Sequence, residues 1–417
     1  MNPAPAHPVD TIPVPVSRHA VTFVLITVFL DMVGFGLILP VLPALIEAVG
    51  GMELADAAYV GGWMFAAFSI AQFAFSPLVG NLSDRFGRRP LLLLAIFGLG
   101  ADYLFSALAP TLFWLFVGRV IAGVCGSSYV IANAYIADVT APKDRARAFG
   151  LVGAAFGVGF VLGPAIGGLL GELGPRVPFY VAAAISVLNL IYGWFVLPET
   201  LPPEKRRRFE WRRSNPFGAF KVFARYASVL PLCAILGVYF FASAVYPAIW
   251  AFWGMAKFGW SEGIVGLTLA AFGLITAIFQ GLVTGPVVAR YGEWRVCLFG
   301  LLIAVVVAFG YGLAGSLVAV LVLLVVHGPE GFVHPMLVAM MSKAVPENAQ
   351  GELQGGISAM MNVAMLFGTV IFAQVFSAFL QPDAAFRSPD VSFFLAAGLL
   401  VGTLLLFLRL VKRPEVA

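Results

Sequence analysis

Charged residues are scarce in this chain of 417 residues, and their scarcity decides its class. Aspartate, glutamate, lysine and arginine together make up 11% of the sequence, whereas ordinary soluble domains contain about 25%. A water-soluble fold of this length could not cover its surface with so few charges. Hydrophobic residues make up 61%, and the apolar runs are continuous rather than alternating, which excludes a transmembrane β-barrel. The composition therefore predicts an all-α integral membrane protein.

Cysteine is also rare, and the three cysteines lie far apart in apolar stretches. This spacing excludes a disulfide framework and shows no pattern of metal ligands. The chain also lacks the G-x-x-x-x-G-K-[ST] loop that binds nucleotide phosphates, so we expect no cofactor and no metal, with an ion gradient as the driving force. The proline-rich N-terminus has no positive charge before Arg18, which excludes a cleavable signal peptide. We expect residues 1–18 to be a disordered tail.

Apolar stretches long enough to cross a membrane are numerous. A membrane-spanning helix needs about 20 apolar residues, and twelve stretches meet this requirement. They lie at 19–46, 57–79, 90–109, 111–138, 147–171, 178–197, 227–253, 262–289, 295–314, 316–342, 353–379 and 390–410.

The positive charges fix the orientation of these spans. If the N-terminus is cytoplasmic, 21 of the 25 lysines and arginines fall in cytoplasmic segments. Cytoplasmic loops of membrane proteins carry such an excess, so we expect both termini in the cytoplasm. The net charge of +4 then reflects topology, and we expect no nucleic-acid partner.

An internal repeat divides the chain into two halves. The longest polar stretch, 199–226, is a predicted cytoplasmic linker between six-helix bundles at 19–198 and 227–411. At an offset of 205 residues, Gly80, Arg85 and Gly87 correspond to a second G-x-x-x-x-R-x-G pattern at 285–292. Repeated halves are typical of transporters in which one half tilts against the other around a site at the bilayer midplane.

The stretch GNLSDRFGRRP at 80–90 is unusually polar for this chain. The general excess of lysine and arginine in cytoplasmic loops explains the arginines of this stretch. It does not explain the presence of Asp84. The pattern G-x-L-x-D-R-x-G-R-R-P between spans 2 and 3 resembles the signature loop of the major facilitator superfamily. The resemblance implies that six residues of this stretch have a gating role. The alternative is that they only anchor the loop between spans 2 and 3. These are Gly80, Asp84, Arg85, Gly87, Arg88 and Arg89.

Further motifs resemble the tetracycline-efflux branch of the drug–proton antiporters in that superfamily. They are LDMVGFGLILPVLP at 30–43, ADYLFSALA at 101–109, GRVIAGVCGS at 118–127 and GAAFGVGFVLGPAIGG at 153–168. The resemblance implies a multi-pass protein of a bacterial inner membrane, active as a monomer, that exports small amphipathic compounds in exchange for protons. It also implies that Asp84 braces the outward-open state against the start of span 11, near Gly355 and Gly356.

Ionisable residues inside membrane spans are costly and mark functional sites. Asp31 lies midway along span 1. Asp102 and Arg119 lie at similar depths in spans 3 and 4, so we expect them to pair across antiparallel helices. The alternative for this pair is a static structural salt bridge. Asp31 has no neighbouring cation in the sequence, which favours a role in proton coupling.

The second half departs from the tetracycline pattern. Ala304 and Thr276 occupy the positions where those pumps carry an intramembrane acid and a histidine. Transport of a tetracycline–metal chelate is therefore in doubt.

Span 10 instead contains VVHGPEGFVHPM. His327, Glu330 and His334 are spaced i, i+3, i+7 and would share one face of a regular helix. We predict that Glu330 and His334 provide proton coupling or substrate binding in the second half. The alternatives are a Glu–His pair that only stiffens span 10, and a metal site.

Glycines in span 5 predict close helix packing through small-xxx-small spacings, such as 153/157, 159/163 and 163/167. By resemblance, this pattern indicates antiport, although a packing face alone would look the same. The motif residues are Gly157, Gly159, Gly163, Pro164 and Gly167.

We also expect a pocket for substrate within the bundle. The residues expected to line it are Gln72, Asn133, Tyr239, Phe240 and Gln280. For the aromatic side chains of span 7, lipid-facing bulk is the alternative.

The sequence therefore favours a proton-coupled antiporter that exports small amphipathic compounds. One alternative is a proton-coupled symporter that takes up a metabolite or organic anion. A second is a non-transporting receptor on the same scaffold. We expect no enzymatic activity, since no nucleophile–base–orienter set is present.

Overall fold

The computed structural model describes residues 18–126, 128–141, 144–346 and 349–413, and these residues form helices and no strands. Except for Arg18, where α1 begins, the expected N-terminal tail lies outside the described residues. Eleven helical segments in the described ranges are long and apolar enough to cross a membrane. This is one fewer than the sequence predicts, because Glu262–Leu313 forms one segment of 52 residues that covers two predicted spans.

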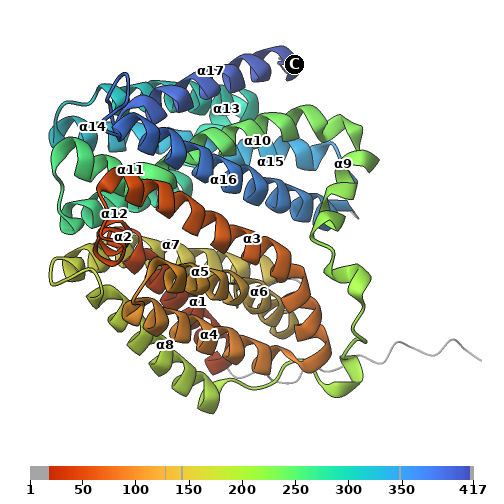
Figure 1. Cartoon of the computed structure of the whole chain (residues 1–417). Helices are drawn as coiled ribbons and strands as arrows, with labels where there is room; N and C mark the ends of the chain where they lie inside the picture. Colours follow the sequence, from red (N-terminus) through yellow and green to blue (C-terminus); the bar gives the residue numbers. More distant parts are fainter. Residues whose placement is uncertain (1–17, 127, 142–143, 347–348, 414–417) are drawn as a thin grey trace, which may run out of the picture.

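Helices α1 to α8 make up the first half, which lies in the lower part of Figure 1. They are α1 (Arg18–Ile38), α2 (Leu42–Gly50), α3 (Leu54–Phe86), α4 (Arg88–Leu108), α5 (Leu112–Cys125), α6 (Ser128–Val139), α7 (Arg145–Gly171) and α8 (Val177–Val196).

The second half lies above it in Figure 1. Its elements are η5 (Ala227–Val229), α10 (Leu230–Ser243), α11 (Val245–Phe258), α12 (Glu262–Ile278), the π-helical turn η6 (Phe279–Val283), α13 (Thr284–Leu313), α14 (Leu317–His327), η7 (Gly328–Phe332), α15 (Val333–Lys343), α16 (Gln350–Leu380) and α17 (Val391–Leu410).

Prolines explain two of the breaks inside predicted spans. A proline ring clashes with the carbonyl four residues earlier and interrupts the helix there. Pro43 is four residues beyond Leu39, and α1 ends at Ile38. Pro247 is four residues beyond Ser243, where α10 ends. Both breaks put irregular backbone between the two halves, close to the cavity described below.

The linker joins the halves along one edge of the molecule (Figure 1). It contains η2 (Pro203–Lys205), η3 (Trp211–Ser214), η4 (Pro216–Phe220) and α9 (Lys221–Arg225). On α3, the Asn81 amide donates to the Ser214 hydroxyl of η3 at 3.0 Å. On α16, Gly356 lies beneath Val222 of α9. The linker is therefore fastened to both halves, and the end of the molecule where it lies is called the linker end below.

The two repeats reverse direction at equivalent glycines. Gly87 separates α3 from α4 with φ 106° and ψ 160°. Gly292, its counterpart in the repeat, has φ 77° and ψ 159° within α13. Such positive φ values are accessible to glycine at little cost. The 52-residue segment therefore contains a reversal at the place where the first half changes from α3 to α4.

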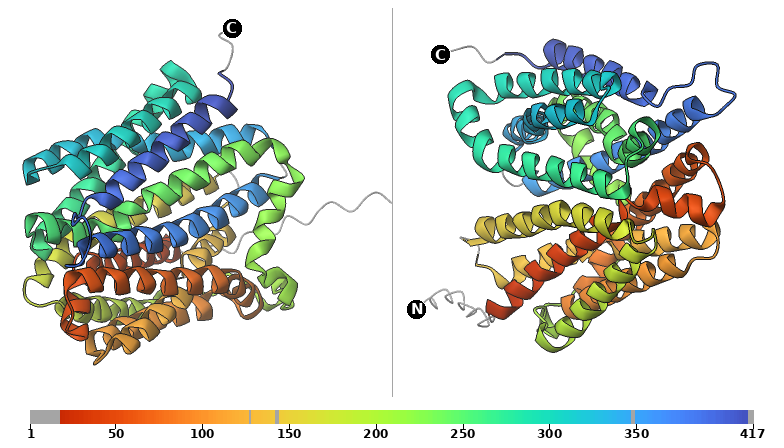
Figure 2. Two further views of the ribbon diagram at one scale, coloured as in Figure 1. Left: turned by 45° about the horizontal axis from the view of Figure 1, so that its top comes forward. Right: turned by 90° about the vertical axis from the view of Figure 1, so that its left-hand side faces the viewer.

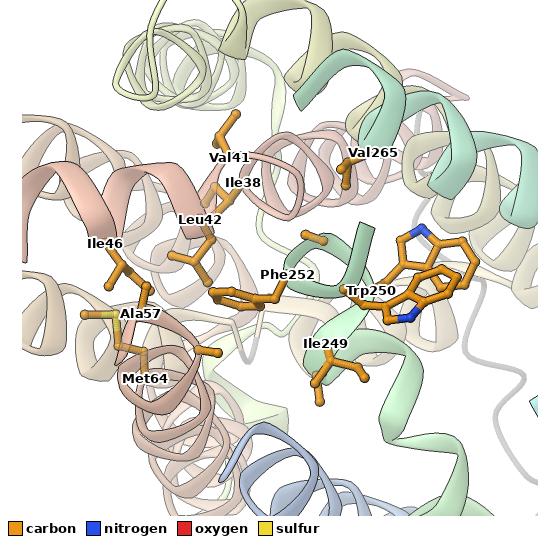
Figure 3. Packing of buried hydrophobic residues seen from close by; sticks show 14 of the residues in the cluster. Ile38, Val41, Leu42, Ile46, Ala57, Met64, Ile249, Trp250, Phe252 and Val265 are labelled. Carbon is orange, nitrogen blue, oxygen red and sulfur yellow. The ribbon is translucent and has the colours of Figure 1, made fainter. Parts of the chain in front are cut away.

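The halves meet tightly at the end opposite the linker. There α3 packs on α16, and α7 packs on α12, an arrangement that the two views of Figure 2 also show. Figure 3 shows Phe252 of α11 between Leu42 and Met64 of the first half and Trp250 of the second. These side chains belong to one buried cluster that crosses the interface. This end of the molecule is closed.

The linker end is more open. A methyl group built on Gly153, Gly285 or Gly355 meets no atom within 4 Å. At the closed end, by contrast, a methyl group on Gly168 would collide with the backbone of Glu262 across the interface. The structure therefore shows a conformation that is shut at one end and loosely packed at the other.

Candidate functional site

A cavity of about 510 Å³ lies between the two halves. This volume is in the range of sites for drug-sized ligands. The first half contributes Phe35, Leu39, Leu42, Pro43, Phe65, Phe68, Ser69, Phe156 and Phe160. The second half contributes Tyr246, Pro247, Ala248, Trp250, Ala251, Phe252, Leu269, Phe272, Tyr311, Leu324, His327, Asn362, Met365 and Thr369. Because both halves build its walls, any rotation of one half against the other changes its shape.

Glu330 lies behind the wall of this cavity and is 3% exposed. His327 Nε2 lies 2.9 Å from its Oε2. The hydroxyls of Tyr239 and Ser243 donate to Oε1 at 3.2 and 3.3 Å, and that of Tyr246 donates to Oε2 at 3.5 Å. A buried carboxylate requires such partners, because an unpaired charge in an apolar interior is very costly.

His327 connects this carboxylate to the cavity. Its Nδ1 lies 3.3 Å from the Tyr311 hydroxyl, and its ring packs against Tyr246 and Phe272. His327, Tyr246 and Tyr311 all line the cavity. Two of the four partners of Glu330, Tyr246 and His327, are therefore side chains that a ligand in the cavity would touch.

The expected common face of His327, Glu330 and His334 is wrong. Residues Gly328–Phe332 form the 3₁₀ turn η7, which advances 120° per residue instead of 100°. Over five residues this adds roughly 100° of rotation. Glu330 accordingly pairs with His327, whereas His334 lies against Phe240 with ring centroids 5.4 Å apart. Within the described ranges, no three His, Cys, Asp or Glu residues are placed to hold a metal ion.

The predicted pair in the first half is present. Arg119 Nη2 lies 2.9 Å from Asp102 Oδ2, and Asp102 is fully buried. Ser106 donates to the other carboxylate oxygen at 3.2 Å. Asp31 is separate from this pair and accepts a hydrogen bond from Ser128 at 2.8 Å.

The residues expected to line the pocket do not line this cavity. The Gln72 side chain donates a hydrogen bond to the Gly126 carbonyl. The Asn133 side chain donates one to the Tyr129 carbonyl in the same helix, α6. Tyr239 is buried against Glu330, with Phe240 edge-on beside it. Gln280 lies near Gly331 instead. Backbone breaks at α1–α2 and α10–α11 turn other residues toward the cavity, and helical spacing alone does not show this.

The polar stretch at 80–90 forms a tight reversal rather than a loop. Arg88 is buried and contacts Asp84 at 2.6 Å and Asp138 at 3.0 Å. Glu199 accepts hydrogen bonds from the backbone N–H groups of Arg88 and Arg89 at the start of α4. Carboxylates are favoured at helix N-termini, so this contact fixes the entry into α4.

The remaining members of the stretch contribute less. Arg85 stacks over Phe86, and Arg89 also donates to the Trp194 carbonyl. A methyl group on Gly80 would be in ordinary contact with Val130.

The expected contact of Asp84 with span 11 is not formed in this conformation. Gly356 is covered by Val222 and Phe223 of α9, and the space next to Gly355 is empty. The expectation concerns an outward-open state, so it stays a prediction for that state.

The glycine face of α7 is partly as expected. A methyl group on Gly163 would lie 2.8 Å from the Gly36 Cα of α1, and one on Gly159 would lie 2.6 Å from the Phe29 carbonyl oxygen. Gly167 touches Leu37, and Pro164 touches Gly36. Gly153 and Gly157 contact nothing within 4 Å, so the expected 153/157 packing pair is wrong: it lies where the halves are loosely packed.

Several residues of the site were not expected from the sequence. Tyr246 and Tyr311 resemble any other aromatic residues in apolar helices, and only the fold brings them to Glu330 and His327. Glu199 carried a clearer signal, since it is an acidic residue at the end of a span on the same side as the arginines at 85–89.

Comparison with known proteins agrees with this architecture. The chain is 38% identical over 368 residues to the tetracycline resistance protein, class C, of Escherichia coli, covering 87% of this chain and 91% of that protein. It is 28% identical over 352 residues to multidrug resistance protein 2 of Bacillus subtilis (strain 168), covering 82% and 85%. The crystal structure of the human organic anion transporter MFSD10 (TETRAN) superposes with a TM-score of 0.69 at 25% identity, covering 94% of this chain and all of that one. The family model for the Major Facilitator Superfamily matches residues 24–328 and 232–417. The chain is therefore a multi-pass membrane transporter that belongs to the Major Facilitator Superfamily.

Proposed function

We propose that this transporter is a proton-driven exporter of small amphipathic compounds in a bacterial inner membrane. It works as a monomer by alternating access around the cavity between its halves, and it needs no cofactor. The curated relatives support export, since their names refer to tetracycline resistance and multidrug resistance.

The proposed topology has twelve spans, in bundles at 19–198 and 227–411, and both termini in the cytoplasm. A helical segment of 52 residues would be about 78 Å long, more than twice the roughly 30 Å of a bilayer core. The reversal at Gly292 supports two spans in this segment. The excess of lysine and arginine supports a cytoplasmic location for the linker end, and in this proposed topology the conformation described here faces inward.

One observation carries the proposal of proton coupling: the buried carboxylate of Glu330 shares two of its four partners, Tyr246 and His327, with the cavity wall. Ionised Glu330 only accepts hydrogen bonds, whereas protonated Glu330 must donate one. Gain of a proton therefore reverses the direction of at least one of these hydrogen bonds, and two of the four groups that can accept from Glu330 are His327 Nε2 and the Tyr246 hydroxyl. Since both side chains line the cavity, protonation and ligand binding act on the same groups.

The exchange then follows from this shared set of partners. A ligand that contacts Tyr246 and His327 favours one orientation of these side chains, and a proton on Glu330 favours another. Binding of one is thereby coupled to release of the other, as linkage between two sites requires. Asp31, Asp102 with Arg119, and His334 stay predicted contributors to coupling. The residues of the 80–90 stretch stay predicted gating residues.

Flux measurements in proteoliposomes test the proposal. Purified protein is reconstituted, a pH gradient of either sign is imposed, and movement of small aromatic amides such as naphthamide is followed. We expect the compounds to move against the direction of proton flow, and Glu330→Gln to abolish gradient-driven movement. Glu204→Gln is the matched control, because Glu204 is exposed in the linker turn η2 and does not line the cavity.

The results separate the alternatives. Accumulation in the direction of proton flow would indicate a symporter. Absence of flux for the parent protein, with a folded sample, would indicate a receptor. Equal gradient-driven flux for the parent and Glu330→Gln would exclude Glu330 from coupling.

A further inference from the structure

The chemistry of the cavity wall narrows the class of ligand. None of its described lining residues is an aspartate, glutamate, lysine or arginine. The wall consists mainly of aromatic and aliphatic side chains, including Phe35, Phe68, Phe156 and Trp250. Aromatic rings favour stacked or edge-to-face contacts with other rings. The wall therefore suits an aromatic ligand.

Most polar atoms of the wall are already engaged within the protein. The Tyr246 hydroxyl donates to Glu330, and the Tyr311 hydroxyl contacts His327. The Trp250 indole N–H donates to Thr268 at 3.0 Å. The Thr369 hydroxyl donates to the Met365 carbonyl of its own helix at 2.9 Å. The donor hydrogens of Tyr246, Trp250 and Thr369 are therefore occupied, and the hydroxyl oxygens offer a ligand only acceptor sites.

Two polar side chains of the wall have no hydrogen-bond partner among the described residues: Ser69 of α3 and Asn362 of α16. They come from opposite halves, on helices that pack against each other. At the closed end, Gly62 meets Ala373. Counting along the two helices from there, Ser69 and Asn362 differ in depth by about four residues, or roughly 6 Å. One small ligand can therefore reach both.

Formal charges near the cavity are paired or lie beyond its wall. Arg119 borders a small neighbouring pocket and is paired with Asp102. Glu330 is paired with His327. Asp31 precedes Phe35 by one helical turn and does not line the cavity. A charged ligand would lose its hydration without gaining an opposite charge in the wall, and the aromatic faces return only about 0.5–2 kcal/mol to a cation. A charge is therefore costly in this apolar site.

We infer that the preferred substrates are uncharged aromatic compounds that carry one hydrogen-bonding edge, such as an amide, and that Ser69 and Asn362 recognise this edge. The inference rests on the proposed function, because it takes this cavity as the transport site. It distinguishes this chain from a pump for a metal-chelated, charged drug.

Binding to the full-length protein in nanodiscs tests the inference separately from transport. The probes are naphthamide, naphthoate and naphthylmethylammonium, which share a ring system and differ in charge, together with methylnaphthalene, which lacks a polar edge. Binding is followed by tryptophan fluorescence, since Trp250 lines the cavity. We expect the parent protein to bind naphthamide at least 10-fold more tightly than either charged probe.

Ser69→Ala and Asn362→Leu should each weaken naphthamide binding by about 3- to 10-fold, as loss of one hydrogen bond does. Neither change should affect methylnaphthalene. The control Asn215→Leu, in the linker, should bind like the parent. Asn362→Asp should shift the preference toward naphthylmethylammonium, a gain that a misfolded variant would not show.

Each outcome decides one point. Equal binding of charged and uncharged probes, or unchanged naphthamide binding in both Ser69→Ala and Asn362→Leu, would overturn the inference while proton-driven flux could still be present. Selective binding without flux under any pH gradient would overturn the proposed function instead.

Discussion

The contact between α1 and α7 allows a quantitative prediction with an internal control. A methyl group on Gly163 would lie 2.8 Å from both the Gly36 Cα and the Val33 carbonyl oxygen. Carbon atoms in favourable contact are about 3.5–4.0 Å apart. Gly163→Ala therefore requires the two backbones to separate by roughly 0.7–1.2 Å. Overpacking of this kind costs about 1–3 kcal/mol.

Gly157→Ala is the matched control, because it makes the same change on the same helix where nothing lies within 4 Å. Alanine is favoured over glycine inside a helix by about 0.5–1 kcal/mol. We expect Gly157→Ala to raise the thermal unfolding midpoint in detergent slightly and Gly163→Ala to lower it. The separation should be on the order of 2–4 °C for a chain of this length. If the two midpoints agree within error, the close approach at Gly163 does not hold the helices together.

Two further predictions concern charges. Arg119→Gln should lower the free energy of unfolding by about 3–5 kcal/mol, because it leaves the fully buried Asp102 carboxylate unpaired. In a thermal unfolding assay, the double variant with Asp102→Asn should recover much of this loss. No recovery would contradict the pairing of Arg119 with Asp102. At the closed end, burial raises the pKa of Glu47 above 4.5, and the carboxylate of Glu262 in the other half raises it further. The closed end should therefore be favoured as pH falls through this raised pKa and weakened as pH rises above it. Spin-label distances across this end should show that dependence for the parent protein and a reduced one for Glu47→Gln; an identical pH profile in both would exclude Glu47 as the titrating group.

The sequence predicted most of the architecture, because membrane insertion leaves a strong signal in composition. Each predicted span corresponds to helical residues in the structure, and the reversals at Gly87 and Gly292 follow the predicted repeat. The pairing of Asp102 with Arg119 was also predictable. Depth along a span follows directly from counting residues at a fixed rise.

The details of the site were less predictable, because they depend on departures from regular helices. The turn η7 rotates His334 away from His327, whereas the prediction from helical spacing assumed a constant 100° per residue. The cavity lining depends on where α1 and α10 break and on how the two halves face each other. Such contacts between distant segments, like that of Tyr246 with Glu330, have no signature in a single sequence.

The linker has a mechanical consequence for the transport cycle. Because η3 is fastened to Asn81 of α3 and α9 covers Gly356 of α16, the segment between these two anchors is a tether with a limited maximum length. It limits how far the linker ends of the two halves can spread. This tether consists of short turns rather than one long helix. The linker can therefore extend and shorten during a transport cycle without breaking a long series of backbone hydrogen bonds.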